Sequence, residues 1–231
     1  MAEYTNCYIA FLDILGFKNI ILNKLPYLSS CDEIYKLYTD NILFQPEIAA
    51  ALGHDNIDIV KRKVMSDSVC FYVESNKECA LEALIKMCIL FQILLLRLPT
   101  PVLVRGAIAR GDIYADGDIL FGPGLVQAYL MEENNAKNPR VILPGSVLNY
   151  AKDNSDKDLK SFVMNVIFCD EDRFFVLDYF DAFKEIFGKG TGIWRDAYQR
   201  VLAQIDDVIN NSLDSSIREK YLYLDKHLRN K

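Results

Sequence analysis

Residues Met87 to Leu98 form an almost wholly apolar segment, and this segment constrains the fold more than any other. It lies within residues 77–98, where we expect a helix that ends before Pro99. The apolar run is shorter than the roughly 20 residues that span a bilayer, and Gln92 interrupts it. We therefore expect a helix buried in the core of the domain, and no membrane contact.

Segments typical of strands and of other helices lie on both sides of this core helix. We expect strands at residues 7–13, 59–65, 69–74, 102–110, 140–143, 161–169 and 173–179. We expect helices at residues 17–25, 32–52, 123–133, 145–152, 193–212 and 214–229. This order predicts an α+β fold with one mainly antiparallel sheet covered by helices. No linker or repeat divides the chain, so we expect a single domain over 1–231, with a core of about 5–180 and a helical C-terminal tail of about 181–231.

The composition excludes several classes of function. A net charge of −6 without a basic stripe argues against nucleic acid as a main partner. Only two histidines are present, which disfavours a histidine-based zinc site. The six cysteines show no CxxC spacing, and no signal peptide is visible, so we expect a reduced cytoplasmic protein. We expect Cys7, Cys70, Cys88 and Cys169 to act as small hydrophobic residues, because each lies in an apolar run.

Two acidic residues occupy unusual positions. Asp13 ends the apolar run CYIAFLD just before Gly16, and Asp67 lies at the tip of a predicted hairpin. An acid at the end of a buried strand is costly unless a cation or hydrogen bonds satisfy it. If the first strand lies beside the hairpin, both carboxylates converge on one edge of the sheet. Two carboxylates there can hold two divalent ions, and their hard oxygens favour Mg²⁺ or Mn²⁺.

Each acid also has a simpler interpretation. A lone Asp at a strand end often caps a helix, and Ser-Asp-Ser in a hairpin is often only a turn. The two acids in this order favour the metal site over these alternatives. The backbone amides of Leu15, Gly16 and Phe17 would then face an anion at the start of the next helix, where glycine allows a phosphate to approach closely.

These motifs resemble those of the class III nucleotidyl cyclases. The likeness rests on FLDILGF (11–17) followed by KVMSDSV (63–69), with weaker support from VRGAIARGDIY (104–114), FGPGLVQAYLMEE (121–133) and PRVIL (139–143). It covers roughly residues 5–180 and is greatest for the short bacterial Pycsar pyrimidine cyclases. The resemblance implies that Asp13, Asp67 and the carbonyl of Ile14 bind the two metal ions.

The resemblance also assigns Lys63 to the nucleotide base, and Ser66 replaces a glycine of the family pattern. Lys63, Met65 and Asp67 share one strand face by the period of two, so Lys63 can reach a nucleotide bound near Asp67. A solvated lysine at a sheet edge is an equally good interpretation of Lys63. The tail carries an apolar stripe that we interpret as a packing or dimer surface. Its members are Trp194, Tyr198, Val201, Ile205, Val208 and Ile209.

One departure from the family pattern concerns the positive charge at the reacting phosphate. Class III cyclases usually carry an Asn and, four residues later, an Arg on the helix after the second glycine-rich stretch, where this chain has Gln127 and Met131. Another cation must then stabilise the transition state. Arg105 and Arg110 are our candidates, with Arg140 behind them. Arg105 and Arg110 face opposite sides of the strand, so we expect only one to reach the site, and either could equally be a surface ion-pair partner. We assign Arg105 to catalysis and Arg110 to substrate binding.

The resemblance implies a symmetric homodimer that cyclises a nucleoside triphosphate by attack of the 3′-hydroxyl on the α-phosphate. We expect UTP as substrate, with 3′,5′-cyclic UMP and pyrophosphate as products, and CTP as the alternative. The cyclic nucleotide would activate a separate effector during phage infection. A diguanylate cyclase is disfavoured because the hairpin reads MSDSV. A non-catalytic nucleotide-binding module remains as a further alternative.

Overall fold

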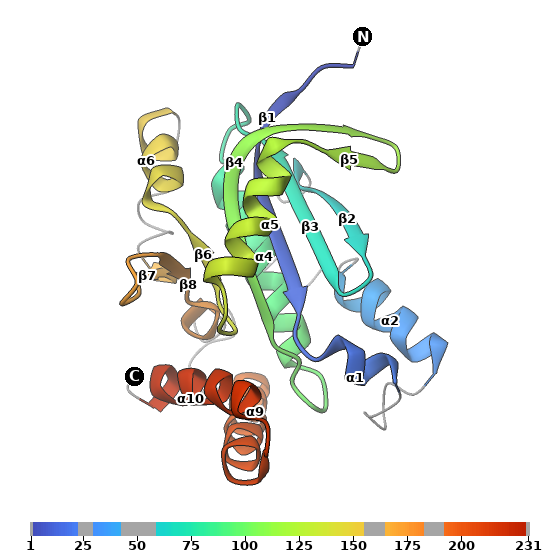
Figure 1. The fold of residues 1–231 in the computed structure, drawn as a ribbon, viewed down its shortest axis with the longest axis vertical. Helices are drawn as coiled ribbons and strands as arrows, with labels where there is room; N and C mark the ends of the chain where they lie inside the picture. Colours follow the sequence, from blue (N-terminus) through green and yellow to red (C-terminus); the bar gives the residue numbers. More distant parts are fainter. Residues whose placement is uncertain (1, 23–29, 43–58, 155–164, 183–191, 230–231) are drawn as a thin grey trace.

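The chain forms an eight-stranded sheet with helices on both faces (Figure 1). The computed structural model describes residues 2–22, 30–42, 59–154, 165–182 and 192–229. The strands follow the order β2 (Lys61–Met65), β3 (Ser68–Glu74), β1 (Thr5–Ile14), β4 (Val104–Asp116), β6 (Val141–Leu143), β8 (Phe175–Leu177) and β7 (Ile167–Cys169), and β5 (Ile119–Phe121) pairs with β4. Among the pairs of described strands only β4–β6 is parallel, which confirms the predicted α+β fold with a mainly antiparallel sheet.

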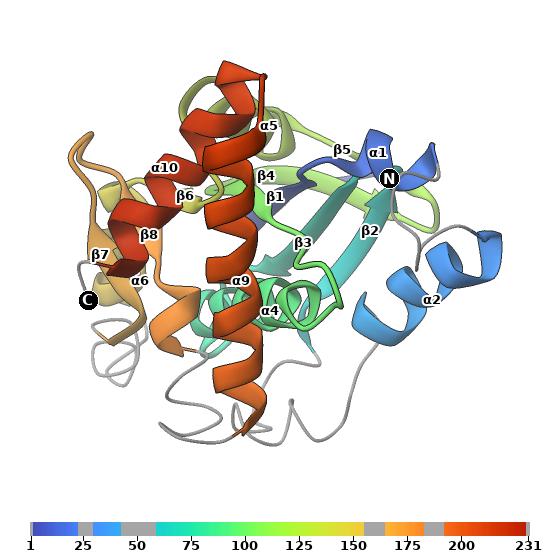
Figure 2. The ribbon, with the colours of Figure 1, turned by 90° about the horizontal axis from the view of Figure 1, so that it is seen from below.

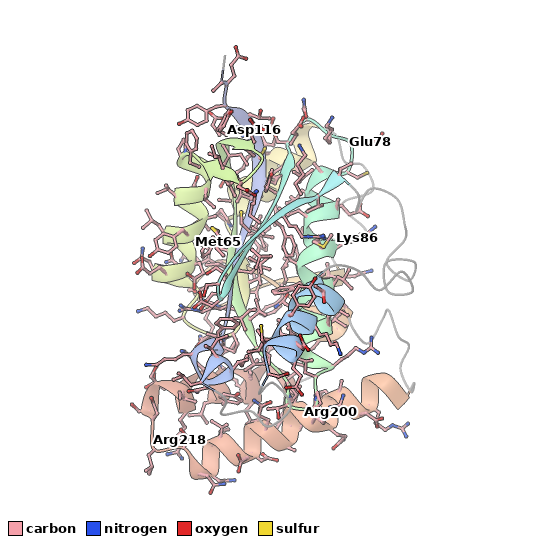
Figure 3. The ribbon with its side chains drawn as sticks, turned by 90° about the vertical axis from the view of Figure 1, so that its right-hand side faces the viewer. Met65, Glu78, Lys86, Asp116, Arg200 and Arg218 are labelled. Carbon is pink, nitrogen blue, oxygen red and sulfur yellow. The ribbon has the colours of Figure 1, made fainter. Side chains whose placement is uncertain are left out.

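The described helices are α1 (Phe17–Ile21), α2 (Cys31–Ile42), α4 (Ala80–Leu96), α5 (Pro123–Asn135), α6 (Gly145–Asn154), α9 (Gly192–Asn211) and α10 (Ser215–Arg229). Helices α4 and α5 lie on opposite faces of the sheet, as Figure 3 shows with the sheet between them. Parts of the predicted helices at 17–25 and 32–52 and of the predicted strand at 161–169 lie outside the described residues.

Helix α4 is the predicted core helix. All of its residues except Glu82 and Lys86 are buried, and these two form an ion pair of 2.6 Å. Tyr8, Ala10 and Leu12 of β1 belong to the same core cluster, so the even-numbered residues of β1 face α4. No helix in the described part of the chain is both long and apolar enough to cross a membrane.

Helix α5 lies against the other face, over β1 and β4, and glycines allow it to approach closely. A Cβ atom added to Gly124 would lie 2.8 Å from the carbonyl carbon of Gly111 in β4. Real side chains do not tolerate such a distance, so this contact requires glycine. The buried residues of α5 are Gly124, Ala128 and Glu132, at the spacing of one helical face. The contact with β4 therefore fixes which residues of α5 point at the sheet.

Helices α9 and α10 form a helical hairpin that we call the C-terminal hairpin. It lies across the end of the sheet where β1 leads into α1 (Figures 1 and 2). Val201 and Ile205 of α9 are buried in the main core, which confirms the packing interpretation of the apolar stripe at these positions. A cavity of about 200 Å³ lies between the hairpin and the turn at Leu15 and Gly16. The C-terminal tail thus lies directly behind that turn.

The burial of the cysteines matches the prediction with one exception. Cys7, Cys70 and Cys88 are buried, and burial raises the pKa of the Cys70 thiol to about 12. Cys169 is exposed, because β7 lies at the edge of the sheet. Its expected role as a buried hydrophobic residue is therefore wrong.

Candidate functional site

Asp13 and Asp67 come together at one end of the sheet. Strand β1 pairs with β3 so that Asp13 is opposite Ser68, the residue that follows Asp67. The N–H of Ile14 donates a hydrogen bond of 2.8 Å to the carbonyl of Asp67, which fixes the hairpin turn to the end of β1. The predicted placement of the first strand beside the hairpin is therefore confirmed.

The turn between β2 and β3 has a backbone conformation that favours glycine at position 66, where the family pattern has a glycine and this chain has Ser66. Ser66 adopts a φ of 57°, in the left-handed region that favours glycine. Ser66 and Asp67 form the two-residue turn between β2 and β3, so the alternation of β2 does not continue to Asp67. The expectation that Lys63, Met65 and Asp67 share one strand face therefore holds only for Lys63 and Met65.

Arg105 lies beside Asp13 on the neighbouring strand. The two residues are partners in the β1–β4 register, and Nε of Arg105 donates a hydrogen bond of 2.8 Å to Oδ2 of Asp13. The side chain of Arg105 is 25% exposed and that of Asp13 is 16% exposed. Arg105 is thus the predicted arginine that the structure brings to the acids.

Glu132 is a member of the site that the sequence analysis missed. Its side chain is 4% exposed, and Oε1 lies 2.8 Å from Nε of Arg105. Burial raises the pKa of Glu132 to about 7; Arg105 lowers it, and Asp13, Glu133 and Asp67 raise it. The influence of Asp13 and Asp67 on one carboxyl shows that the three acids surround the same region. The four-residue spacing of Gly124, Ala128 and Glu132 was the signal that could have identified it.

Gln127 and Met131 of α5 occupy the positions of the family's Asn and Arg, and neither forms a hydrogen bond with Arg105 in the described part of the chain. Gln127 is exposed on α5, and Met131 packs beside the apolar cluster around Cys7 and Ile9. The residue of α5 that faces the acids is therefore an acid, and the nearby cation comes from β4.

Arg110 and Arg140 are excluded from the site by their surroundings. Arg110 lies on the α4 face of the sheet with its guanidinium 3.2 Å from the ring centre of Tyr150, so we withdraw it as a substrate-binding residue. Arg140 is buried and forms ion pairs with Asp170 and Asp172. It links the β7–β8 turn to the end of α5 and has a structural role.

Lys63 contacts the β4–β5 turn. Its ammonium group donates to the carbonyl of Gly117, and Nζ lies 3.5 Å from the fully exposed carboxylate of Asp118. The sequence predicted the strand and face of Lys63 but not this partner. A donor and an acceptor thus lie side by side at the rim of the sheet.

The residues predicted to bind phosphate lie at the turn between β1 and α1. Gly16 adopts a φ of 78° and begins the turn into α1. The N–H of Leu15 donates a hydrogen bond of 2.9 Å to Leu103, so this amide does not face an anion and its predicted role is wrong. The side chain of Phe17 is buried in the main core, which leaves only its backbone for a contact with substrate.

The donor set fits a divalent cation at Asp13 and Asp67. The carboxyl groups of Asp13 and Glu132 both lie 2.8 Å from Nε of Arg105, so two acids share one guanidinium beside the turn that carries Asp67. Carboxylate oxygens are the ligands that Mg²⁺ and Mn²⁺ prefer. No group of three acidic, histidine or cysteine side chains within the described ranges is close enough to hold a metal ion. The predicted ligands Asp13 and Asp67 are a pair of side chains, and the resemblance adds only the backbone carbonyl of Ile14 to them.

Comparison with solved structures identifies the fold. The guanylyl cyclase domain of the RhoGC fusion protein from the aquatic fungus Blastocladiella emersonii matches with a TM-score of 0.50 and 16% identity, covering 76% of this chain and 96% of that domain. The chain therefore shares the fold of a class III nucleotidyl cyclase domain, as the sequence predicted.

Weaker matches are found to other cyclases. A bacterial light-regulated adenylyl cyclase matches with a TM-score of 0.47 and 14% identity, over 84% of this chain and 99% of the other. The adenylate/guanylate cyclase/hydrolase from Silicibacter pomeroyi matches with a TM-score of 0.45 and 20% identity, over 68% of this chain and 86% of the other. No protein-family model and no curated protein sequence matches this chain.

Proposed function

We propose that this protein is a nucleotidyl cyclase of the class III kind, with Asp13 and Asp67 as its metal-binding residues. The proposal rests on one observation, the convergence of these two acids beside Arg105 at the end of β1. The acids occupy the positions that the family motifs assign to metal ligands, on a fold shared with a cyclase domain.

The chemistry follows from the charges at this end of the sheet. Divalent cations held by Asp13 and Asp67 would promote deprotonation of the ribose 3′-hydroxyl and neutralise the phosphates. Arg105 is one of the side chains beside Asp13 and is partly exposed, so its guanidinium is available to the charge that develops at the α-phosphate. A Cβ atom added to Gly16 would meet no atom within 4 Å, so the backbone of this turn is open to a phosphate group. The reaction closes a 3′,5′-cyclic phosphate and releases pyrophosphate.

We propose UTP as the preferred substrate and CTP as the second choice. Lys63 and Asp118 offer a donor beside an acceptor. Uracil presents a complementary pair, because its O4 accepts from an ammonium group and its N3–H donates to a carboxylate. Cytosine presents an amino donor to the ammonium group of Lys63 and an N3 acceptor to the carboxylate of Asp118, so donor meets donor and acceptor meets acceptor. In the biological setting that the resemblance implies, the cyclic pyrimidine nucleotide activates a separate effector during phage infection.

We also propose that the active form is a homodimer. The outer face of α5 carries exposed apolar side chains, of which Val126 is 54% exposed and Leu130 is 45% exposed. Ile119 and Phe121 of β5 continue this surface. A second copy of the chain could cover this apolar surface and complete the surroundings of the triphosphate. One chain alone supplies only Arg105 among the arginines predicted for the site. Sedimentation of active protein strictly as a monomer at high dilution would contradict the homodimer.

The experiment that tests the activity is incubation of the purified protein with Mn²⁺ and all four triphosphates in competition. We expect cyclic UMP as the main product, and no product from Asp13→Ala or Asp67→Ala, both of which should remain folded. Cyclic AMP or cyclic GMP as the main product would overturn the pyrimidine assignment, and cyclic CMP only the choice of uracil. Activity within a few-fold of the unmodified protein in either variant would overturn the metal assignment.

A non-catalytic nucleotide-binding module is the second candidate. It is favoured by the absence of an arginine at the helix position occupied by Met131. Saturable binding of a triphosphate without any cyclic product, in Mn²⁺ or Mg²⁺, would support this candidate over the cyclase.

A further inference from the structure

A single N–H group of Arg105 lies between two carboxylates. Its Nε is 2.8 Å from Oδ2 of Asp13 and 2.8 Å from Oε1 of Glu132. This nitrogen carries one hydrogen, which is donated to Asp13. Oε1 of Glu132 is buried and accepts no hydrogen bond within the described part of the protein. The same donor can therefore satisfy either acid, but not both together.

The unsatisfied oxygen makes a second arrangement favourable. The side chain of Glu132 is only 4% exposed, so its carboxyl group is largely withdrawn from bulk solvent. A buried carboxyl oxygen that accepts no hydrogen bond is costly, and the cost is greatest when the carboxyl group is ionised. The donor has only a short way to move, because it is already within hydrogen-bond distance of both acids. A cation that neutralises Asp13 removes the reason for Arg105 to remain there.

We propose that Glu132 is a positioning residue that takes over the guanidinium of Arg105 when a divalent cation binds Asp13. The inference rests on the proposed function insofar as that function places the cation at Asp13. Arg105 is then a built-in competitor for the cation, and Glu132 lowers the free energy needed to displace it. The exchange keeps the positive charge of Arg105 beside the acids, where a bound triphosphate meets it.

The test is the affinity for Mn²⁺ measured by calorimetry without nucleotide, so that it does not depend on catalysis. Glu132→Gln removes the alternative acceptor, and we expect binding about ten-fold weaker, which corresponds to about 1.4 kcal/mol. Glu132→Asp keeps the charge but shortens the side chain, and we expect a similar loss. Arg105→Gln removes the competitor and should tighten binding. The control is Glu133→Gln, an exposed neighbour whose replacement should have little effect.

Three outcomes would overturn the inference. Unchanged affinity in Glu132→Asp would show that Glu132 acts only through its charge. A further loss of affinity when Glu132→Gln is added to Arg105→Gln would show that Glu132 binds the ion directly. Weaker binding in Arg105→Gln would exclude competition, and this variant decides the matter even if a substitution at Glu132 prevents folding.

Failure of the proposed function has a different signature. If Asp13→Ala binds Mn²⁺ as the unmodified protein does, the cation does not lie at Asp13, and both the metal assignment and the exchange are wrong. If Asp13→Ala loses Mn²⁺ but any of the three outcomes above is seen, the metal assignment stands and only the role of Glu132 is overturned.

Discussion

Replacing Glu132 with glutamine should change how the stability of the protein depends on pH. The pKa of this buried carboxyl is raised from 4.5 to about 7, chiefly by burial. Between these values the folded state binds more protons than the unfolded state, so the free energy of unfolding decreases as the pH rises. Glutamine has nearly the same shape and does not titrate, so Glu132→Gln should lack this contribution.

The magnitude follows from the shift in pKa. Each unit corresponds to about 1.4 kcal/mol, so a rise from 4.5 to about 7 corresponds to about 3 kcal/mol. Relative to Glu132→Gln, the unmodified protein should therefore lose about 3 kcal/mol of stability between about pH 4.5 and about pH 7 and change little above that range. The charged groups that act on Glu132 are Asp13, Asp67, Arg105 and Glu133.

The assay is urea unfolding followed by circular dichroism across this pH range, with EDTA present to remove metal ions. Glu133→Gln is the matched control, because it removes one acid from the exposed side of the same helix. Glu133 is a minor cause of the raised pKa of Glu132, so this variant should keep the pH dependence with a slightly smaller change. A difference between the unmodified protein and Glu132→Gln that does not vary with pH would refute the reasoning. A difference of the opposite sign would show that Arg105 outweighs burial and holds Glu132 ionised.

Three further outcomes follow from the packing and the ion pairs. Gly124→Ala should destabilise the protein by about 1–3 kcal/mol in thermal or urea unfolding, because its Cβ would lie 2.8 Å from the backbone of Gly111; unchanged stability would contradict the close contact. Arg140→Ala should cost about 3 kcal/mol by the same measurement, since it leaves Asp170 partly buried without its guanidinium; a cost below about 1 kcal/mol would contradict a structural role. Lys63→Met should reduce the preference for UTP over CTP about ten-fold without weakening Mn²⁺ binding, and an unchanged preference would remove Lys63 from the base.

The elements of this fold were predictable because each is encoded in a continuous segment. The apolar run around Ile89 could only be a buried helix. The turn at Asp67 lies between two short runs typical of strands, and Asp13 ends a third. Strand pairing then brings the two acids together without further information, which is why their convergence could be predicted from the sequence.

The rest of the site depends on contacts between distant segments. The sequence showed that Arg105 and Arg110 face opposite sides of β4, but not which side the acids share. Lys63 is 54 residues from its partner Gly117, and no local pattern links the two. The Leu15 amide was expected to face an anion, yet Leu103, which precedes β4, takes its hydrogen bond.

Glu132 shows how tertiary contact decides the chemistry of a helix. The phase of α5 is set by the contact of Gly124 with Gly111, and from that contact the residue eight positions later must face the sheet. The family pattern has an Asn and an Arg at the positions of Gln127 and Met131, and neither of these is among the buried residues of α5. Strand register fixes Arg105 opposite Asp13, so the positive charge beside the acids comes from β4 and not from α5.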